Sequence, residues 1–183
     1  MLRPSSMRIG LMRHFPVTEP LPKGWLTEGD LAKWRQRYDA AEVVVGPYDL
    51  GGVEWKSCLS SDLSRAASTA AHVFSGRIFY TSLLREPELG TFNTGRLRLP
   101  LLLWKWFIRL AWAAGFESQK AKRDEFRSHV STMADQLEER TEDTLVVCHA
   151  VMMLFLSQEL ERRGYNGPKL KVARHAVTYV YER

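Results

Sequence analysis

Short apolar runs alternate along this chain with longer segments in which apolar residues follow helical spacing. The apolar runs typical of buried strands lie at 7–15, 53–60, 78–80 and 144–148. Helical spacing follows them at 31–41, 63–74, 118–140 and 151–163. The C-terminal residues 169–181 are rich in β-branched side chains and are predicted to be extended. Strands that alternate with helices predict an α/β domain with a largely parallel sheet.

Residues at the predicted helix ends support this division. Thr27 is a candidate N-cap, and the acidic Glu28 and Asp30 would lie in the first turn of the helix that follows. Ser61 or Asp62 is placed to cap the helix predicted at 63–74. Helices are therefore expected to start at both positions.

Polar side chains follow each predicted strand. The first strand stops at Arg13 and His14, because Pro16 restricts its own backbone and that of Phe15. The later strands are followed by further polar groups: Ser60, Ser61, Asp62 and Arg65 after the second, Arg85 and Glu86 after the third, and His149 after the fourth. The carboxyl ends of parallel strands share one edge of the sheet, where ligands bind. These side chains are expected to gather there.

Such a set of residues suits phosphoryl chemistry. Arginine guanidinium groups match phosphate oxygens with two parallel hydrogen bonds. A neutral imidazole can attack phosphorus, and a carboxylic acid can protonate the oxygen that leaves. The sequence therefore predicts a pocket for a phosphoryl group.

Composition narrows the class of partner. The chain has 183 residues, a size that suits one domain, and carries 26 Lys and Arg against 21 Asp and Glu, a net charge of +5. The basic residues are scattered, so an anionic small molecule is favoured over nucleic acid.

Cys58 and Cys148 lie far apart without metal-ligand spacing. With no apolar leader at the N-terminus, a reducing cytoplasm is the expected location.

The apolar segment 99–115 needs a separate interpretation. Lys105 and Arg109 lie at its middle, where each would cost about 2.5–3.5 kcal/mol in a bilayer, so a membrane span is not expected. A helix that covers the sheet is the favoured interpretation. A homodimer face or an apolar lid beside the site stays open as an alternative.

Five blocks of the sequence resemble those of a known family. They are LMRHF at 11–15, LTEGD at 26–30, SSDLSRAASTA at 60–70, LREPELG at 84–90 and LVVCHA at 145–150. In this order they resemble the signature blocks of the histidine phosphatases, the superfamily that includes the cofactor-dependent phosphoglycerate mutases. The resemblance implies a single-domain, three-layer α/β/α sandwich that spans residues 7–183.

The resemblance also implies a role for each matched residue. His14 would be the nucleophile that becomes a phosphohistidine, and Glu86 would protonate the leaving group and then activate water. The phosphoryl oxygens would be bound by Arg13, Arg65, His149 and Ser61. No metal and no cofactor is expected. Glu88 stays open as an alternative acid, and the remaining histidines, His72, His129 and His175, match no block and are interpreted as surface or core residues.

Two positions depart from the family pattern. Phe15 and Ala150 stand where the family has glycine after each histidine. Phe15 is expected either to crowd the phosphate or to turn away from it, and Ala150 matters only if its φ is positive.

The short segment between the candidate acid and His149 favours a phosphatase over a mutase. The expected substrate is a small phosphate ester or a phosphoprotein, with inorganic phosphate as product. A catalytically weak module that binds phosphate ligands is the second interpretation.

Overall fold

The chain is built around a five-stranded sheet in a computed structural model that describes residues 7–87, 96–104, 106, 110 and 117–183. The strand order is β4-β3-β6-β1-β7. The strands are β1 (Arg8–Arg13), β3 (Ser57–Ser61), β4 (Ile78–Thr81), β6 (Thr144–Cys148) and β7 (Thr178–Glu182). The first four are parallel, and β7 pairs antiparallel with β1 at one edge. The predicted largely parallel α/β sheet is confirmed.

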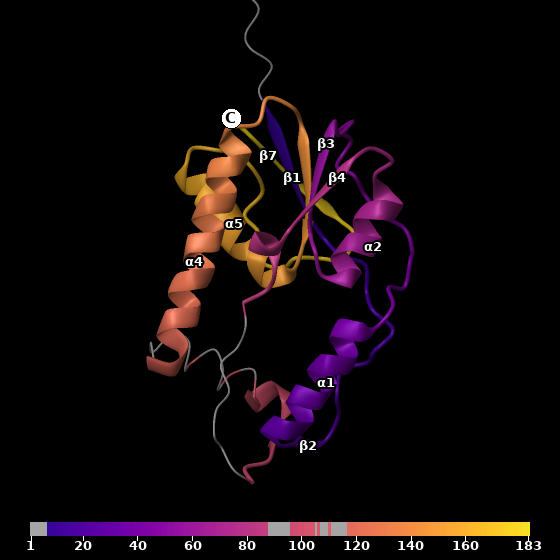
Figure 1. Cartoon of the computed structure of the whole chain (residues 1–183), viewed down its shortest axis with the longest axis vertical. Coiled ribbons are helices and arrows are strands. Elements are labelled where there is room, and N and C mark those ends of the chain that lie inside the picture. Colours follow the sequence, from indigo (N-terminus) through magenta and orange to yellow (C-terminus); the bar gives the residue numbers. More distant parts are fainter. Residues whose placement is uncertain (1–6, 88–95, 105, 107–109, 111–116) are drawn as a thin grey trace, which may run out of the picture.

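Helices cover both faces of this sheet (Figure 1). Helices α4 (Glu117–Glu138) and α5 (Ala150–Arg162) pack on one face, and α2 (Ser64–Val73) packs on the other. Alternate residues of β1 point to opposite faces, so Leu11 belongs to the core under α4 and α5, and Met12 to the core under α2. The three-layer sandwich implied by the resemblance is therefore confirmed.

A smaller group of elements lies beyond the C-terminal end of the sheet (Figure 1). It contains β2 (Trp25–Leu26), α1 (Glu28–Ala40) and β5 (Leu99–Pro100), which pairs with β2. The helical residues 101–104 join it, since the buried Trp104 donates a hydrogen bond from Nε1 to the Leu26 carbonyl at 2.7 Å.

The expectation that the segment 99–115 covers the central sheet is wrong for its described part, which lies beside β2. Residues 105, 107–109 and 111–116, and with them Lys105 and Arg109, lie outside the described residues. Leu102, Trp106 and Leu110 are exposed, and a dimer face there stays a prediction. Of the helices that the structure describes, none has the length and apolarity needed to cross a membrane.

The two predicted helix starts have different outcomes. Thr27 caps α1 as expected, because its hydroxyl accepts from Asp30 N at 3.2 Å while the Asp30 carboxylate accepts from Thr27 N. The cap predicted for α2 is wrong, since the N-cap is Leu63 and makes no side-chain cap bond. Asp62 instead binds Arg85 through both carboxylate oxygens, at 2.7 and 2.6 Å. The second strand is also shorter than predicted and begins only at Ser57.

Candidate active site

Two buried histidines lie side by side where β1 and β6 end. The parallel register places Arg13 opposite Cys148, and His14 N donates to the Cys148 carbonyl at 3.1 Å. The next residues, His14 and His149, are 2% and 0% exposed, and their ring centroids are 5.2 Å apart. Neighbouring parallel strands thus bring together two imidazoles that are 135 residues apart in the sequence.

His14 presents a bare ring nitrogen to the site. Its Nδ1 lies 2.6 Å from the Phe15 carbonyl oxygen. A carbonyl only accepts, so Nδ1 carries the proton and Nε2 carries the lone pair. Burial lowers the pKa of His14 to about 3, and the charges of Arg65 and Arg13 act in the same direction. His14 is therefore neutral at pH 7, as a nucleophile must be.

His149 bonds Ser61 through one ring nitrogen and leaves the other without a partner among the described residues. Its Nε2 lies 3.0 Å from Ser61 Oγ, which itself accepts from Leu63 N at 3.4 Å. The Ser61 hydroxyl has one proton to donate and two lone pairs, so this network is compatible with a His149 tautomer that accepts at Nε2 and carries its proton on Nδ1. Nδ1 is buried and has no hydrogen-bond partner among the described residues. Burial, followed by the charge of Arg65, lowers the pKa of His149 to about 2.

Two arginines supply further donors around the histidines. Arg65 is 1% exposed, and its Nη1 binds Asp39 Oδ1 at 2.8 Å. Arg13 donates from Nη1 to the Ala173 carbonyl at 3.1 Å. The remaining buried atoms, Arg65 Nε and Nη2 and Arg13 Nε, have no partner in the described part of the chain. Buried donors without partners are costly, so this cluster is suited to bind an anion.

Glu86 contacts the start of α5. It follows the 3-10 helix η1 (Ser82–Leu84), and its Oε1 accepts from Val151 N at 3.2 Å. The preceding Arg85 is fixed by its two bonds to Asp62. Glu86 also lines a cavity of about 330 Å³, together with Ser82, Arg85, Pro87, Lys122, Glu125, Phe126 and His129. The alternative acid, Glu88, lies outside the described residues.

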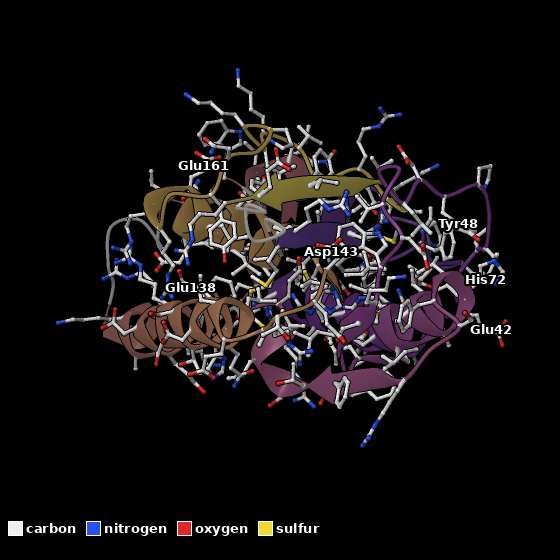
Figure 2. The ribbon with its side chains drawn as sticks, turned by 90° about the horizontal axis from the view of Figure 1, so that it is seen from above. Glu42, Tyr48, His72, Glu138, Asp143 and Glu161 are labelled. Atoms are coloured by element: carbon white, nitrogen blue, oxygen red, sulfur yellow. The ribbon has the colours of Figure 1, made fainter. Side chains whose placement is uncertain are left out.

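Phe15 turns away from this site. Its side chain is 1% exposed and packs in the core beneath α2. The ring centroid lies 5.6 Å from that of His72 and 6.4 Å from that of Tyr48, two residues that adjoin one another in Figure 2. The Phe15 amide donates to Thr69 Oγ1 at 3.0 Å, which fixes this direction. The bulk of the side chain therefore does not enter the phosphoryl pocket.

Ala150 also replaces glycine without strain. It is the first residue of α5. Among the described residues other than glycine, only Ala176 has a positive φ, at 55°. The φ angle of Ala150 is therefore not positive, and alanine adopts this backbone conformation without strain.

Four residues near the site were not predicted from the sequence. His175, which matches no block, is half-buried: its ring centroid lies 5.3 Å from that of His14, and its Nδ1 donates to the His14 carbonyl at 2.7 Å. The other three, Arg35, Tyr38 and Asp39, come from α1 and contact or act on Arg65 and His149. Their spacing of three and four residues puts them on one helix face, which was the available signal.

The lowered histidine pKa values predict that the fold loses stability in acid. Between pH 6.5 and the folded pKa values, the unfolded chain binds one more proton at His14 and one more at His149. The free energy of unfolding is expected to fall by about 1.4 kcal/mol per pH unit for each histidine as the pH drops from 6 to 5. Urea unfolding at several pH values measures this slope.

The variant His14→Asn should lower that slope by about half. Equal slopes in the wild type and in His14→Asn would contradict the prediction.

No group of three or more His, Cys, Asp and Glu side chains in the described residues is arranged to hold a metal ion.

The sequence model of the histidine phosphatase superfamily (branch 1) matches residues 45–182. The chain belongs to this superfamily, whose members include phosphatases. The matched range begins after Arg13 and His14. No curated protein sequence matches the chain.

Solved structures share the fold. The alpha-ribazole phosphatase from Shigella flexneri is 21% identical, with a TM-score of 0.53 over 84% of this chain and 79% of that one. A mycobacterial glucosyl-3-phosphoglycerate phosphatase is 19% identical, with a TM-score of 0.52 over 85% and 80%. The phosphoglycerate mutase from Bacillus anthracis is 16% identical, with a TM-score of 0.53 over 86% and 81%. At these identities the likeness establishes the fold alone.

Proposed function

We propose that this protein is a phosphomonoesterase that works through a phosphohistidine on His14. The observation that carries the proposal is the set of buried donors without described partners beside the bare Nε2 of His14. They are Arg65 Nε and Nη2, Arg13 Nε and His149 Nδ1. Donors held in fixed positions stabilise the charge that develops on transferring phosphoryl oxygens.

In the first half of the reaction, His14 Nε2 attacks phosphorus. The N–P bond forms as the bond from phosphorus to the ester oxygen breaks. The Arg13 and Arg65 guanidinium groups bind the phosphoryl oxygens, and His149 donates from Nδ1 to the same group. Glu86, protonated at this stage, gives its proton to the departing oxygen.

In the second half, water attacks the phosphohistidine. Glu86, now a carboxylate, takes the proton from this water, and the N–P bond breaks to release inorganic phosphate. The Val151 amide that donates to Glu86 Oε1 holds the carboxyl group at the start of α5. One carboxyl group thus serves as acid and then as base.

The proposed substrate is a small phosphorylated metabolite or a phosphoprotein, and the proposed location is the cytoplasm. Two solved structures of this fold belong to an alpha-ribazole phosphatase and a glucosyl-3-phosphoglycerate phosphatase. Both names support hydrolysis of an ester on a small metabolite. The weak binding module was motivated by Phe15, whose side chain lies in the core, so the steric reason for low activity no longer applies.

The experiment that tests the proposal is rapid-quench hydrolysis of p-nitrophenyl phosphate in the presence of EDTA. We expect steady turnover unaffected by EDTA, and a phosphorylated enzyme that is stable in base and labile in acid, as a phosphoramidate is. Tight binding of phosphate without turnover or phosphoenzyme would favour the binding module. Turnover that EDTA abolishes would contradict the metal-independent mechanism.

A further inference from the structure

Helix α1 reaches the phosphoryl pocket through Asp39. This carboxylate is 41% exposed, yet its Oδ1 binds the 1% exposed Arg65 Nη1 at 2.8 Å. The Asp39 carbonyl also accepts from Ser64 Oγ at 3.2 Å. The last turn of α1 is therefore joined to the first turn of α2 by two bonds, one to Ser64 and one to Arg65.

A ring from the same helix also contacts the guanidinium of Arg65. Arg65 Cζ lies 5.1 Å from the ring centroid of Tyr38, within the range of a cation-π interaction. The bond from Nη1 to Asp39 and the Tyr38 ring both restrict the orientation of the guanidinium. Its other donors, Nε and Nη2, are buried without partners among the described residues. The Asp39 carboxylate thus binds Nη1 of the Arg65 guanidinium and leaves Nε and Nη2 to an anion.

The same carboxylate also lies near a third arginine. Asp39 Oδ2 is 3.8 Å from Arg35 Nε, and the charge of Arg35 contributes to the lowered pKa of His149. Asp39 is therefore the negative charge between two cations that both act on the site. By charge alone, it would weaken the binding of an anionic substrate.

We propose that Asp39 is a positioning residue that orients Arg65 toward the phosphoryl group. The proposal rests on the phosphatase function proposed above. The carboxylate supports catalysis by holding Arg65 in place, since a small misplacement of a binding group lowers the rate greatly. Its negative charge acts in the opposite direction, because it repels an anionic substrate. Orientation and charge therefore predict opposite effects when the carboxylate is removed.

The test is the substitution Asp39→Asn. Loss of one charge-assisted hydrogen bond is expected to weaken the binding of inorganic phosphate by about tenfold, measured by calorimetry. The kcat for p-nitrophenyl phosphate is expected to fall by about 10- to 100-fold. Asp39→Glu, which keeps the charge but lengthens the side chain, should recover part of both. Tighter phosphate binding by Asp39→Asn would overturn the proposal and show that only charge matters.

A double-mutant cycle separates positioning from a structural effect. Arg65→Lys removes the planar fork. In that background, Asp39→Asn should lower kcat and phosphate affinity by less than about twofold. Equal costs in both backgrounds would contradict the proposal. The matched control is Glu19→Gln, since Glu19 pairs with Arg37 on the same helix at 2.8 Å without a contact to the site. Its phosphate affinity, kcat and urea midpoint should match the wild type.

The binding measurement also separates the two proposals. If the wild type binds phosphate but hydrolyses no ester, the phosphatase function fails, whereas the effect of Asp39→Asn on phosphate affinity still decides the role of Asp39. If the wild type turns over and Asp39→Asn matches it, the positioning role fails and the phosphatase function stands.

Discussion

The substitution His14→Asn is expected to abolish turnover, with a loss of kcat of about 10⁴-fold or more. Its imidazole Nε2 is the nucleophile in the proposed mechanism, whereas the delocalised amide of asparagine is too weak a nucleophile to attack phosphorus. Because Asn is polar and smaller, it can keep a hydrogen bond to the Phe15 carbonyl that now binds His14 Nδ1. Hydrolysis of p-nitrophenyl phosphate and acid-labile phosphorylation measure the effect.

Two observations make this prediction specific. Arg13 and Arg65 remain in the variant, so inorganic phosphate should still bind, which shows that the pocket is folded. The control His72→Asn changes an exposed histidine on α2 and should retain kcat within about twofold. Turnover of His14→Asn within tenfold of the wild type would rule out His14 as the nucleophile.

The sheet could be predicted from the sequence because its signals are local. Each parallel strand is a short apolar run that ends at a polar residue, as in β6, where His149 follows Cys148. The start of α2 was mispredicted for a reason that is not local. Asp62 has the side chain of a good N-cap, but Arg85, 23 residues away, binds both of its oxygens. A charge-assisted bidentate pair is stronger than a single cap bond.

The candidate site was predictable only where residues follow strands. His14, His149 and the neighbouring Arg13 take their positions from the parallel register of β1 and β6. Asp39 lies on a helix outside the sheet. Its spacing from Arg35 indicates a shared helix face, but not that this face packs on Arg65. His175 reaches His14 because the chain before β7 runs beside the end of β1, where Ala176 N donates to the Arg13 carbonyl at 2.9 Å.

The direction of Phe15 depended on packing in the same way. A strand that ends at Arg13 leaves the next side chains free to point either way. The Thr69 hydroxyl and the core beneath α2 select one direction for Phe15. Burying an aromatic ring there also contributes to stability, since full burial of such a side chain is worth about 1.5–3 kcal/mol. A departure from the family pattern thus became part of the core.

The substitution Glu86→Gln is expected to lower kcat by about 10²- to 10⁴-fold for alkyl phosphate esters. An alkoxide is a poor leaving group and needs the proton that the Glu86 carboxyl supplies. Nitrophenolate is a stable anion and leaves without one, so p-nitrophenyl phosphate should lose much less in its first half-reaction. The variant should accumulate phosphoenzyme from this ester, because the same carboxyl no longer activates water. Rapid-quench measurements on both esters test this split.

The amide of the variant can still accept from Val151 N, which preserves the contact to α5 and limits the change to proton transfer. Glu125→Gln is the matched control, because Glu125 lines the same cavity as Glu86. It should leave the ratio of the two ester rates unchanged.

Glu88→Gln decides between the two candidate acids. If it produced the leaving-group dependence and Glu86→Gln did not, the acid would be Glu88, and the position of Glu86 at the start of α5 would be structural.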